Sequence, residues 1–220
     1  MDPVRQPRVK ICCIGGIEEA RLAIFYGASA VGLVSDMPSG PGPIPEERIA
    51  DIARSIPPGV ACFLLTCRQD AASIIDQQRR LGTNTLQLVD AVPPGVYKEL
   101  RIALPGIALV QVVHVTGESA IDEARNIASH VDAILLDSGN PNLPVKELGG
   151  TGRRHDWTIS RRIREEMTVP IFLAGGLNPQ NVREAIDTVR PFALDVCSGV
   201  RTNGKLDERK LMDFFAAARG

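Results

Sequence analysis

The strongest constraint on the fold is a regular alternation of short apolar runs with segments of helical periodicity. Runs typical of buried parallel strands occupy residues 9–14, 30–34, 60–66, 85–89, 108–115, 133–136, 171–174 and 194–197. Segments with helical spacing and start signals follow them at residues 18–26, 45–55, 70–81, 94–103, 118–130, 157–167, 178–189 and 207–219. Eight such units predict an α/β fold of the (β/α)₈ TIM-barrel type, with an eight-stranded parallel sheet.

Size and charge narrow the class of protein. At 220 residues with 44% hydrophobic side chains, the chain can bury one large core, so we expect residues 1–220 to form one domain. The net charge of -1 and the scattered Lys and Arg residues argue against a nucleic-acid partner. Residues 1–10 are polar and contain two prolines, and no apolar run is long enough to span a bilayer. We therefore expect a cytoplasmic protein without a signal peptide.

Glycine-bearing turns gather in the second half of the chain, at residues 149–152, 174–177 and 197–200, behind an acidic turn at 136–138. Three of these four turns directly follow predicted strands, so they would open at one rim of the barrel. A single glycine turn often serves only the chain reversal, but several on one rim bring backbone N–H groups close to a ligand, and phosphate uses such donors best. We predict a phosphate site at Gly150, Gly152, Gly175, Gly176, Ser198 and Gly199.

The five cysteines lie in or beside predicted strands, without CxxC pairs or the Cys/His spacing of a zinc site. We expect free thiols and no metal. Cysteine in a strand is usually a packing residue, yet Cys12, which follows Lys-Ile on the first strand, is a candidate catalytic residue. On a strand, Cys13 would point to the opposite face and pack in the barrel. We interpret Cys62, Cys67 and Cys197 as structural.

Asp137 ends the sixth predicted strand, after an apolar run and before a glycine-rich loop. Such a residue can simply cap a turn, but this position favours a carboxyl whose pKa is raised by its surroundings and that acts as an acid. His114 is either a core histidine or a substrate contact. Arg153 and Arg154 are either solvated or able to reach an anion beside the glycine loop, and Asp195 is interpreted as hydrogen-bonded scaffolding.

Several motifs stand in order at strand ends as they do in one enzyme family. They are Lys10-Ile11-Cys12, Leu135-Leu136-Asp137, Gly149-Gly150-Thr151-Gly152 with Asp156-Trp157, Leu173-Ala174-Gly175-Gly176-Leu177-Asn178-Pro179, and Asp195 with Ser198-Gly199-Val200. As a set that spans almost the whole chain, they resemble phosphoribosylanthranilate isomerase, a family of tryptophan biosynthesis.

The resemblance implies a barrel that carries out an Amadori rearrangement without a cofactor. The ribose ring of a phosphorylated small-molecule substrate opens, a proton leaves carbon 2, and a 1-deoxyribulose ketone forms through an enol. The resemblance assigns Asp137 as the general acid and Cys12 as the general base. The first and sixth strands lie roughly across a barrel, which suits groups that act on opposite sides of a sugar. We expect a monomer or a homodimer.

The chain departs from this family where the aromatic group would bind. The family usually has Ser-Pro-Arg after the second strand, and its arginine meets the anthranilate carboxylate, whereas residues 37–43 here read Met-Pro-Ser-Gly-Pro-Gly-Pro. The usual Gln-Leu-His-Gly is Gln87-Leu88-Val89-Asp90, and the usual Lys-Ile-Cys-Gly is Lys10-Ile11-Cys12-Cys13. A carboxylate at Asp90 would repel an anionic aglycone. We predict an isomerase that keeps the sugar-phosphate chemistry with changed substrate specificity.

Two other classes of function would use the same phosphate turns. An aldolase or epimerase needs a Schiff-base lysine or a metal-binding set near the strand ends, but Lys146 lies in a loop and the three histidines form no metal pattern. A regulatory barrel that only binds a phosphorylated ligand needs neither Cys12 nor Asp137. The presence of both residues favours catalysis.

Overall fold

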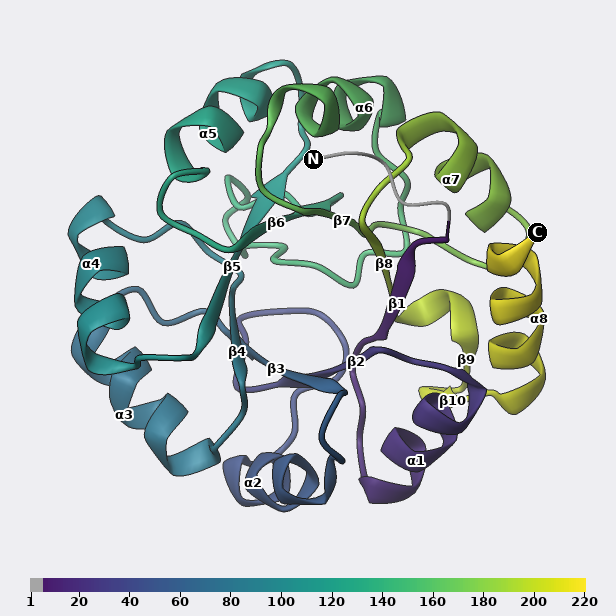
Figure 1. The fold of residues 1–220 in the computed structure, drawn as a ribbon, viewed down its shortest axis with the longest axis horizontal. Coiled ribbons are helices and arrows are strands. Elements are labelled where there is room, and N and C mark those ends of the chain that lie inside the picture. The colour runs from purple at the N-terminus through teal and green to yellow at the C-terminus, as the bar shows by residue number, and fades with distance from the viewer. Residues whose placement is uncertain (1–5) are drawn as a thin grey trace.

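Eight parallel strands close into a barrel in the computed structural model, which describes residues 6–220 (Figure 1). Neighbouring strands pair in sequence order, and the last strand closes on the first. The strands are β1 (Arg8–Ile11), β2 (Ala30–Val34), β3 (Ala61–Thr66), β4 (Thr85–Leu88), β5 (Ala108–His114), β6 (Ala133–Asp137), β7 (Ile171–Leu173) and β8 (Ala193–Val196). The predicted (β/α)₈ fold is confirmed, with strand ends shifted by up to three residues.

Within residues 6–220, eight helices surround the barrel, one after each strand (Figure 1). They are α1 (Ile17–Tyr26), α2 (Glu46–Ser55), α3 (Ala71–Leu81), α4 (Pro94–Ala103), α5 (Ser119–Ile127), α6 (Trp157–Glu166), α7 (Val182–Val189) and α8 (Glu208–Arg219). Asp70, Asp156 and Asp207 cap α3, α6 and α8 by accepting hydrogen bonds from backbone N–H groups of the first turn. The α7 helix starts later than predicted, because Asn178 instead folds a turn by accepting from the N–H groups of Gln180 and Asn181.

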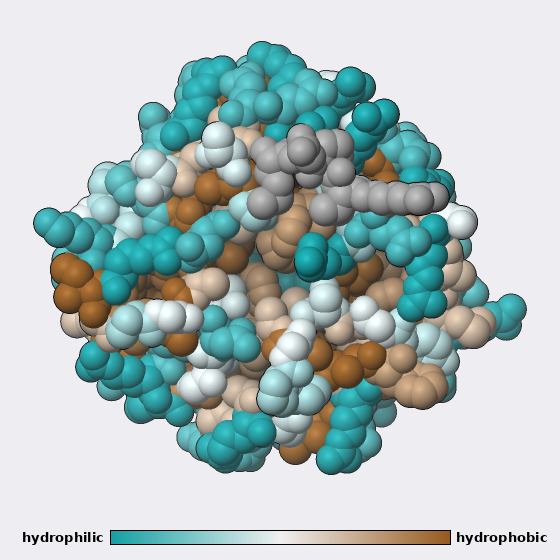
Figure 2. Space-filling model, viewed as in Figure 1, coloured by the Kyte–Doolittle hydropathy of each residue, from teal (hydrophilic) through white to brown (hydrophobic). Residues whose placement is uncertain are grey.

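Two apolar layers hold the barrel together. One fills its interior, with residues such as Phe63, Leu135 and Phe172, and the other lies between the strands and the helices. Because both faces of each strand are covered, the strands read as continuous apolar runs in the sequence. Figure 2 shows hydrophilic residues over the helices at the outer edge of the face in view, with apolar residues toward its middle. No helix of residues 6–220 has both the length and the apolar character needed to cross a membrane.

The first strand ends earlier than its sequence predicts. Cys13 has a φ of 61°, in the left-handed region, so the extended backbone stops after Ile11. A side chain other than glycine in this region costs about 1–2 kcal/mol. Hydrogen bonds on both sides of the bend, from Cys12 N–H to Val196 and from Ile14 N–H to Gly32, hold it in place. The bend puts two consecutive cysteines at the carboxyl end of the barrel.

The two long loops that follow β2 and β6 meet at this same end. Ser39 donates a hydrogen bond to the carbonyl oxygen of Lys146 at 2.5 Å. Pro41 packs so closely on Gly150 that a Cβ atom at Gly150 would lie 2.4 Å from the proline ring. A short helix η1 (Ser198–Val200) and a hairpin of β9 (Arg201–Thr202) and β10 (Lys205–Leu206) follow β8. Together these segments surround the opening of the barrel.

Candidate active site

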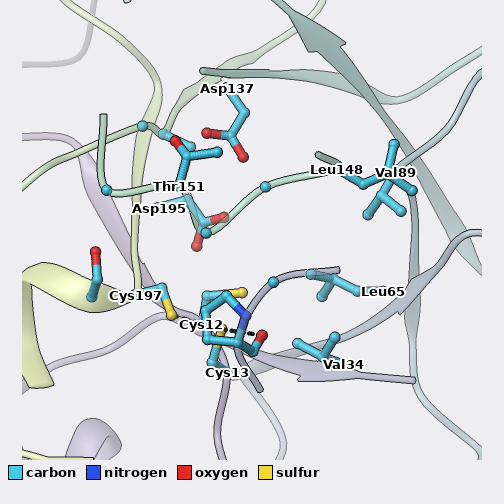
Figure 3. A pocket seen from close by; sticks show the side chains of 18 of the residues that line it. Cys12, Cys13, Val34, Leu65, Val89, Asp137, Leu148, Thr151, Asp195 and Cys197 are labelled. Atoms are coloured by element: carbon cyan, nitrogen blue, oxygen red, sulfur yellow. Dashed lines mark hydrogen bonds between the residues drawn. The ribbon is translucent and has the colours of Figure 1, made fainter. Parts of the chain in front are cut away.

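A pocket opens at the carboxyl end of the barrel, between the strand ends and the two long loops (Figure 3). The space between its walls is about 690 Å³, which includes solvent at its open mouth. Three kinds of residue line it: thiols with carboxylates, glycine turns, and apolar side chains.

A buried ion pair forms the base of the thiol side. Lys10 on β1 is fully buried, and its Nζ donates to Asp195 Oδ2 of β8 at 2.8 Å and to Cys12 Sγ at 3.4 Å. Burial, the largest single effect, would lower the pKa of Lys10, but Asp195 and Cys12 together outweigh it and hold the pKa above its ordinary value. Gly32 on β2 leaves room for this arrangement, since a Cβ there would lie 2.8 Å from Cys12 Sγ. A permanent cation therefore faces the Cys12 thiol.

The pKa of the Cys12 thiol lies below its ordinary value. The hydrogen bond from Cys13 contributes most to this lowering, burial opposes it, and the Lys10 ammonium adds to it. A lowered pKa enlarges the thiolate fraction at neutral pH, and the thiolate is the form that takes up a proton or attacks an electrophile. The Cys12 side chain can therefore act as a base.

Cys13 faces the pocket as well, because its positive φ turns the backbone at the end of β1. Cys13 packs in the apolar cluster inside the barrel, as predicted, but the prediction that it points to the opposite face from Cys12 is wrong. The Cys13 thiol donates to the Pro41 carbonyl oxygen at 3.6 Å and accepts from the Cys197 thiol, with 2.6 Å between the two sulfur atoms. Arg201, paired with Glu19 at 3.0 Å, fixes this turn by donating to the carbonyl oxygens of Cys12 and Cys13. Cys197, which the sequence suggested to be structural, also lines the pocket.

Asp137 lies across the pocket from Cys12 (Figure 3). It ends β6, is 9% exposed, and its Oδ1 accepts from the backbone N–H of Ser138 at 2.7 Å. Burial raises the pKa of the Asp137 carboxyl, and the Ser138 N–H offsets only part of that rise. Gly149 leaves room beside the second oxygen, because a Cβ there would lie 2.8 Å from Asp137 Oδ2. The carboxyl can therefore serve as a proton donor toward the pocket.

The glycine turns converge on the next part of the wall. A Cβ at Gly176 would lie 2.8 Å from the Arg153 backbone, and one at Gly199 would lie 1.9 Å from the Leu177 carbonyl oxygen. Only glycine allows the three turns to pack this closely. Within residues 6–220, the N–H groups of Gly152, Gly175 and Gly176 donate to no backbone acceptor. They are available to an anion.

The predicted phosphate residues largely come together. Gly150, Gly152, Gly175, Gly176 and Ser198 line the pocket, whereas Gly199 lies behind the wall, where it allows the turns to pack. The Ser198 hydroxyl is near Gly152, since a Cβ on Gly152 would lie 3.6 Å from Ser198 Oγ. A phosphate here would be held by main-chain N–H groups and one hydroxyl.

The remaining candidates from the sequence lie outside the pocket. Arg153 pairs with Glu147, and Arg154 pairs with Glu184 at 2.8 Å while its guanidinium lies 3.6 Å from the centre of the Trp157 ring. His114 Nε2 lies 3.0 Å from the Val89 carbonyl oxygen, and the ring borders a separate cavity. Within residues 6–220, no three or more His, Cys, Asp or Glu side chains are placed to hold a metal ion.

An apolar wall completes the pocket on the side of the second to fourth strands. Val34, Leu65, Val89 and Leu148 point into it (Figure 3). None of the described residues that line the pocket is Lys or Arg. Lys146, from the loop above, pairs with Asp90 instead. This wall suits an apolar, planar group better than an anion.

Sequence reasoning missed several residues of the site. Asp195 was interpreted as scaffolding, but it also lines the pocket and its Oδ1 has no partner within residues 6–220. Thr151, whose hydroxyl lies 2.8 Å from that of Ser138, was not singled out. The apolar wall was missed too, although Val34, Leu65 and Val89 stand at or beside the ends of consecutive predicted strands, which is a usable signal.

Comparisons with known proteins agree with this geometry. The family model described as N-(5'phosphoribosyl)anthranilate (PRA) isomerase matches residues 10–217. An N-(5'-phosphoribosyl)anthranilate isomerase of Methanocella arvoryzae is 35% identical, over 96% of this chain and 98% of the relative. Phosphoribosyl anthranilate isomerase of Thermotoga maritima superposes with a TM-score of 0.81 at 34% identity, over 97% of this chain and 98% of that structure. Another structure of such an isomerase, with reduced 1-(o-carboxyphenylamino)-1-deoxyribulose 5-phosphate, gives 0.80 at 31% identity, over 97% and 98%.

Replacing Lys10 with Met should slow alkylation of Cys12 by iodoacetamide at neutral pH. The change removes the cation that favours the thiolate, so the pKa of Cys12 rises and labelling slows about tenfold for each unit of rise. Labelling rates are measured over a pH series by peptide mass spectrometry that separates Cys12 from Cys13. The curve of rate against pH should move to higher pH.

Because Lys10→Met leaves Asp195 buried without its cation, the double variant with Asp195→Asn serves as a second test with a neutral site. It should show the same direction of change. Lys98→Met, on the exposed side of α4, is the control and should label like the unaltered protein. A common pH midpoint in all four proteins would contradict the role of Lys10.

Ribose 5-phosphate should stabilise the protein through the glycine turns. At a hundredfold excess over its dissociation constant, the ligand adds about 2.7 kcal/mol to the free energy of unfolding, measured as a shift in thermal midpoint. Gly176→Asp should abolish the shift, since it puts a negative side chain against the turn. Gly95→Asp, at a glycine with open space around it, should keep the shift. An equal shift in both variants would place the ligand elsewhere.

Proposed function

The chain belongs to the N-(5'-phosphoribosyl)anthranilate isomerase family, and we propose that its pocket rearranges an N-linked 5-phosphoribosyl substrate with Asp137 as acid and Cys12 as base. The chain is an aldose–ketose isomerase of tryptophan biosynthesis. In the proposed sequence, Asp137 gives a proton to the ring oxygen as the bond from carbon 1 to that oxygen breaks. Cys12 then takes the proton from carbon 2, and the resulting enol becomes the ketone.

One observation carries this proposal: two groups with opposite pKa shifts share one pocket. The pKa of Asp137 lies above its ordinary value, and the pKa of Cys12 lies below its own. The reaction needs the carboxyl protonated and the thiol deprotonated in the same molecule. That combination becomes about tenfold more populated for each unit by which the two pKa values approach each other. The surroundings of both residues therefore favour the reactive form.

The glycine turns support the binding of the substrate's 5-phosphate. Their N–H groups, which donate to no described backbone acceptor, belong to the loops that follow β6 and β7 and line the same pocket as Cys12 and Asp137. A phosphate fixed there would hold the sugar between Cys12 and Asp137, so that each group meets its own face of the ring. Positioning of this kind supplies a large part of the rate in reactions without a cofactor.

The apolar wall supports the binding of the group attached to the ribose nitrogen. Val34, Leu65, Val89 and Leu148 can cover a flat ring, but no Lys or Arg among the described lining residues meets a carboxylate on that ring. Lys146, the lysine of the loop after β6, is paired with Asp90 and is not among the described residues that line the pocket. We therefore propose that the enzyme binds its aglycone by apolar contact and gains little from a carboxylate.

The wider assignments follow from the same proposal. The partner is a phosphorylated small molecule, and the place of action is the cytoplasm. The chain acts as a monomer or a homodimer, and a family member of Thermotoga maritima is described as dimeric. The barrel, from β1 to α8, supports the proposal that residues 1–220 are one domain.

Cys12→Ala and Asp137→Asn should each lower kcat by roughly 10²- to 10⁴-fold, because each removes a proton-transfer group. The measurement is steady-state turnover of phosphoribosylanthranilate. Both variants should keep the thermal stabilisation by ribose 5-phosphate, which shows that the fold and the phosphate site remain. Cys67→Ala, at a cysteine outside the pocket, should turn over like the unaltered enzyme. Normal turnover in Cys12→Ala would refute the assignment of the base.

Pro41→Arg should raise kcat/KM for phosphoribosylanthranilate by about tenfold or more, since a charge-assisted hydrogen bond contributes about 1.5–3 kcal/mol. Pro41 lines the pocket, whereas a side chain at Gly42 would collide with Cys13. The phosphoribosyl derivative of aniline, which lacks the carboxylate, should gain nothing. Pro41→Gln is the neutral control. A native enzyme that strongly prefers the carboxylated substrate would show that another group already meets this charge.

A further inference from the structure

The Cys13 and Cys197 thiols form a contact pair in the wall of the pocket. Their sulfur atoms lie 2.6 Å apart, and both residues line the same opening. Cys13 is buried, while Cys197 is half-buried and closer to solvent. A bound pair of sulfur atoms needs about 2.05 Å, so a small shift of two side chains would join them.

The backbone around the pair is held in place. The two residues stand at the ends of β1 and β8, which pair side by side, and the Cys12 N–H bonds the Val196 carbonyl at 2.8 Å. Arg201 donates to the Cys13 carbonyl oxygen at 2.6 Å. Cys13 also keeps a left-handed backbone, which orients its side chain toward Cys197. The pairing of β1 with β8 therefore holds Cys13 and Cys197 next to each other.

We infer that Cys13 and Cys197 are a modification site, a dithiol that reacts reversibly with low-molecular-weight disulfides. The Cys197 thiolate attacks one sulfur of the small disulfide, whose S–S bond breaks and releases one thiolate. The Cys13 thiol then loses its proton to solvent and attacks Cys197, which releases the second small thiolate. The protein dithiol is oxidised to a disulfide, and the small disulfide is reduced to two thiols.

The other cysteines differ from this pair. Cys62 is buried and Cys67 donates to the Asp36 carbonyl oxygen at 3.3 Å, away from the pocket. Cys12 is held by Lys10, and Asp195 stands on the far side of that ammonium. Cys13 is a poor disulfide partner for Cys12, because two adjacent cysteines can close only a small, strained ring. The geometry therefore selects Cys13 and Cys197.

Oxidation of the pair would change the catalytic base. In the reduced form, the single S–H proton of Cys13 serves either the Cys12 sulfur, whose pKa it lowers, or the Pro41 carbonyl oxygen. A disulfide removes that S–H group, so Cys12 loses a donor and the loop at Pro41 loses a contact. Lys10, Asp195 and, across the pocket, Asp137 remain as the other charged groups that face Cys12. Isomerase activity at neutral pH should fall by about tenfold for each unit by which the Cys12 pKa rises.

The test treats the reduced full chain with oxidised glutathione and follows it by mass spectrometry without reductant. We expect loss of two hydrogen atoms, a peptide pair linked through Cys13 and Cys197, and no glutathione left on the protein. Turnover should fall by tenfold or more and return with dithiothreitol. The chemical readout does not depend on the proposed reaction, so a protein with no isomerase activity would still form the link.

Matched variants make the result decisive. Cys13→Ser should stop at a glutathione adduct on Cys197, and Cys197→Ser should form no linked peptide. Cys67→Ser should link like the unaltered chain. A link through Cys12, or a stable glutathione adduct as the end product in the unaltered chain, would overturn the inference. Full linkage with unchanged turnover would overturn its connection to the base.

Discussion

The ion pair of Lys10 and Asp195 is the interaction on which barrel and site both depend. It joins the first strand to the last at the seam where the barrel closes, with both side chains away from water. Removing one member of such a pair costs about 3–5 kcal/mol, because the other charge stays buried without compensation. The same ammonium faces Cys12, so the closure of the fold fixes the charge beside the thiol. The Lys10 ammonium therefore contributes both to the stability of the fold and to the reactivity of Cys12.

The rest of the pocket is organised around that seam. Strands β6 to β8 bring the acid and the glycine turns to one side, and β2 to β4 bring apolar side chains to the other. The pKa values of Asp137 and Cys12 are shifted in opposite directions by different causes, burial for Asp137 and hydrogen bonding for Cys12. The two shifts act on the same quantity, the population of molecules in which both groups are ready to transfer a proton.

The sequence predicted the barrel, the order of its strands and most of the glycine turns that line the pocket, since periodicity and glycine positions reflect local backbone needs. Prediction from the sequence failed where tertiary contacts determine how a side chain is placed. Cys13 was placed on the wrong face, because nothing local reveals a left-handed residue at the end of β1. The sequence allowed Arg153 and Arg154 to reach an anion, but they form salt bridges with Glu147 and Glu184 instead. Cys13 and Arg154 depend on partners distant in sequence, and Arg153 pairs with a residue of its own loop. The spacing of residues in the sequence predicts none of these contacts.

The glycine turns present main chain to the pocket, and the apolar wall presents side chains. Substitution can change what a side chain presents, but every residue carries the same N–H group, provided the turn still folds. The two halves are therefore unequally open to evolution. Substitutions at Val34, Leu65 or Val89 can change which group the apolar wall accepts. The main-chain N–H groups of the glycine turns would still be able to bind the anionic group of the ligand. A barrel built in this way can change its substrate without having to rebuild the means of holding it.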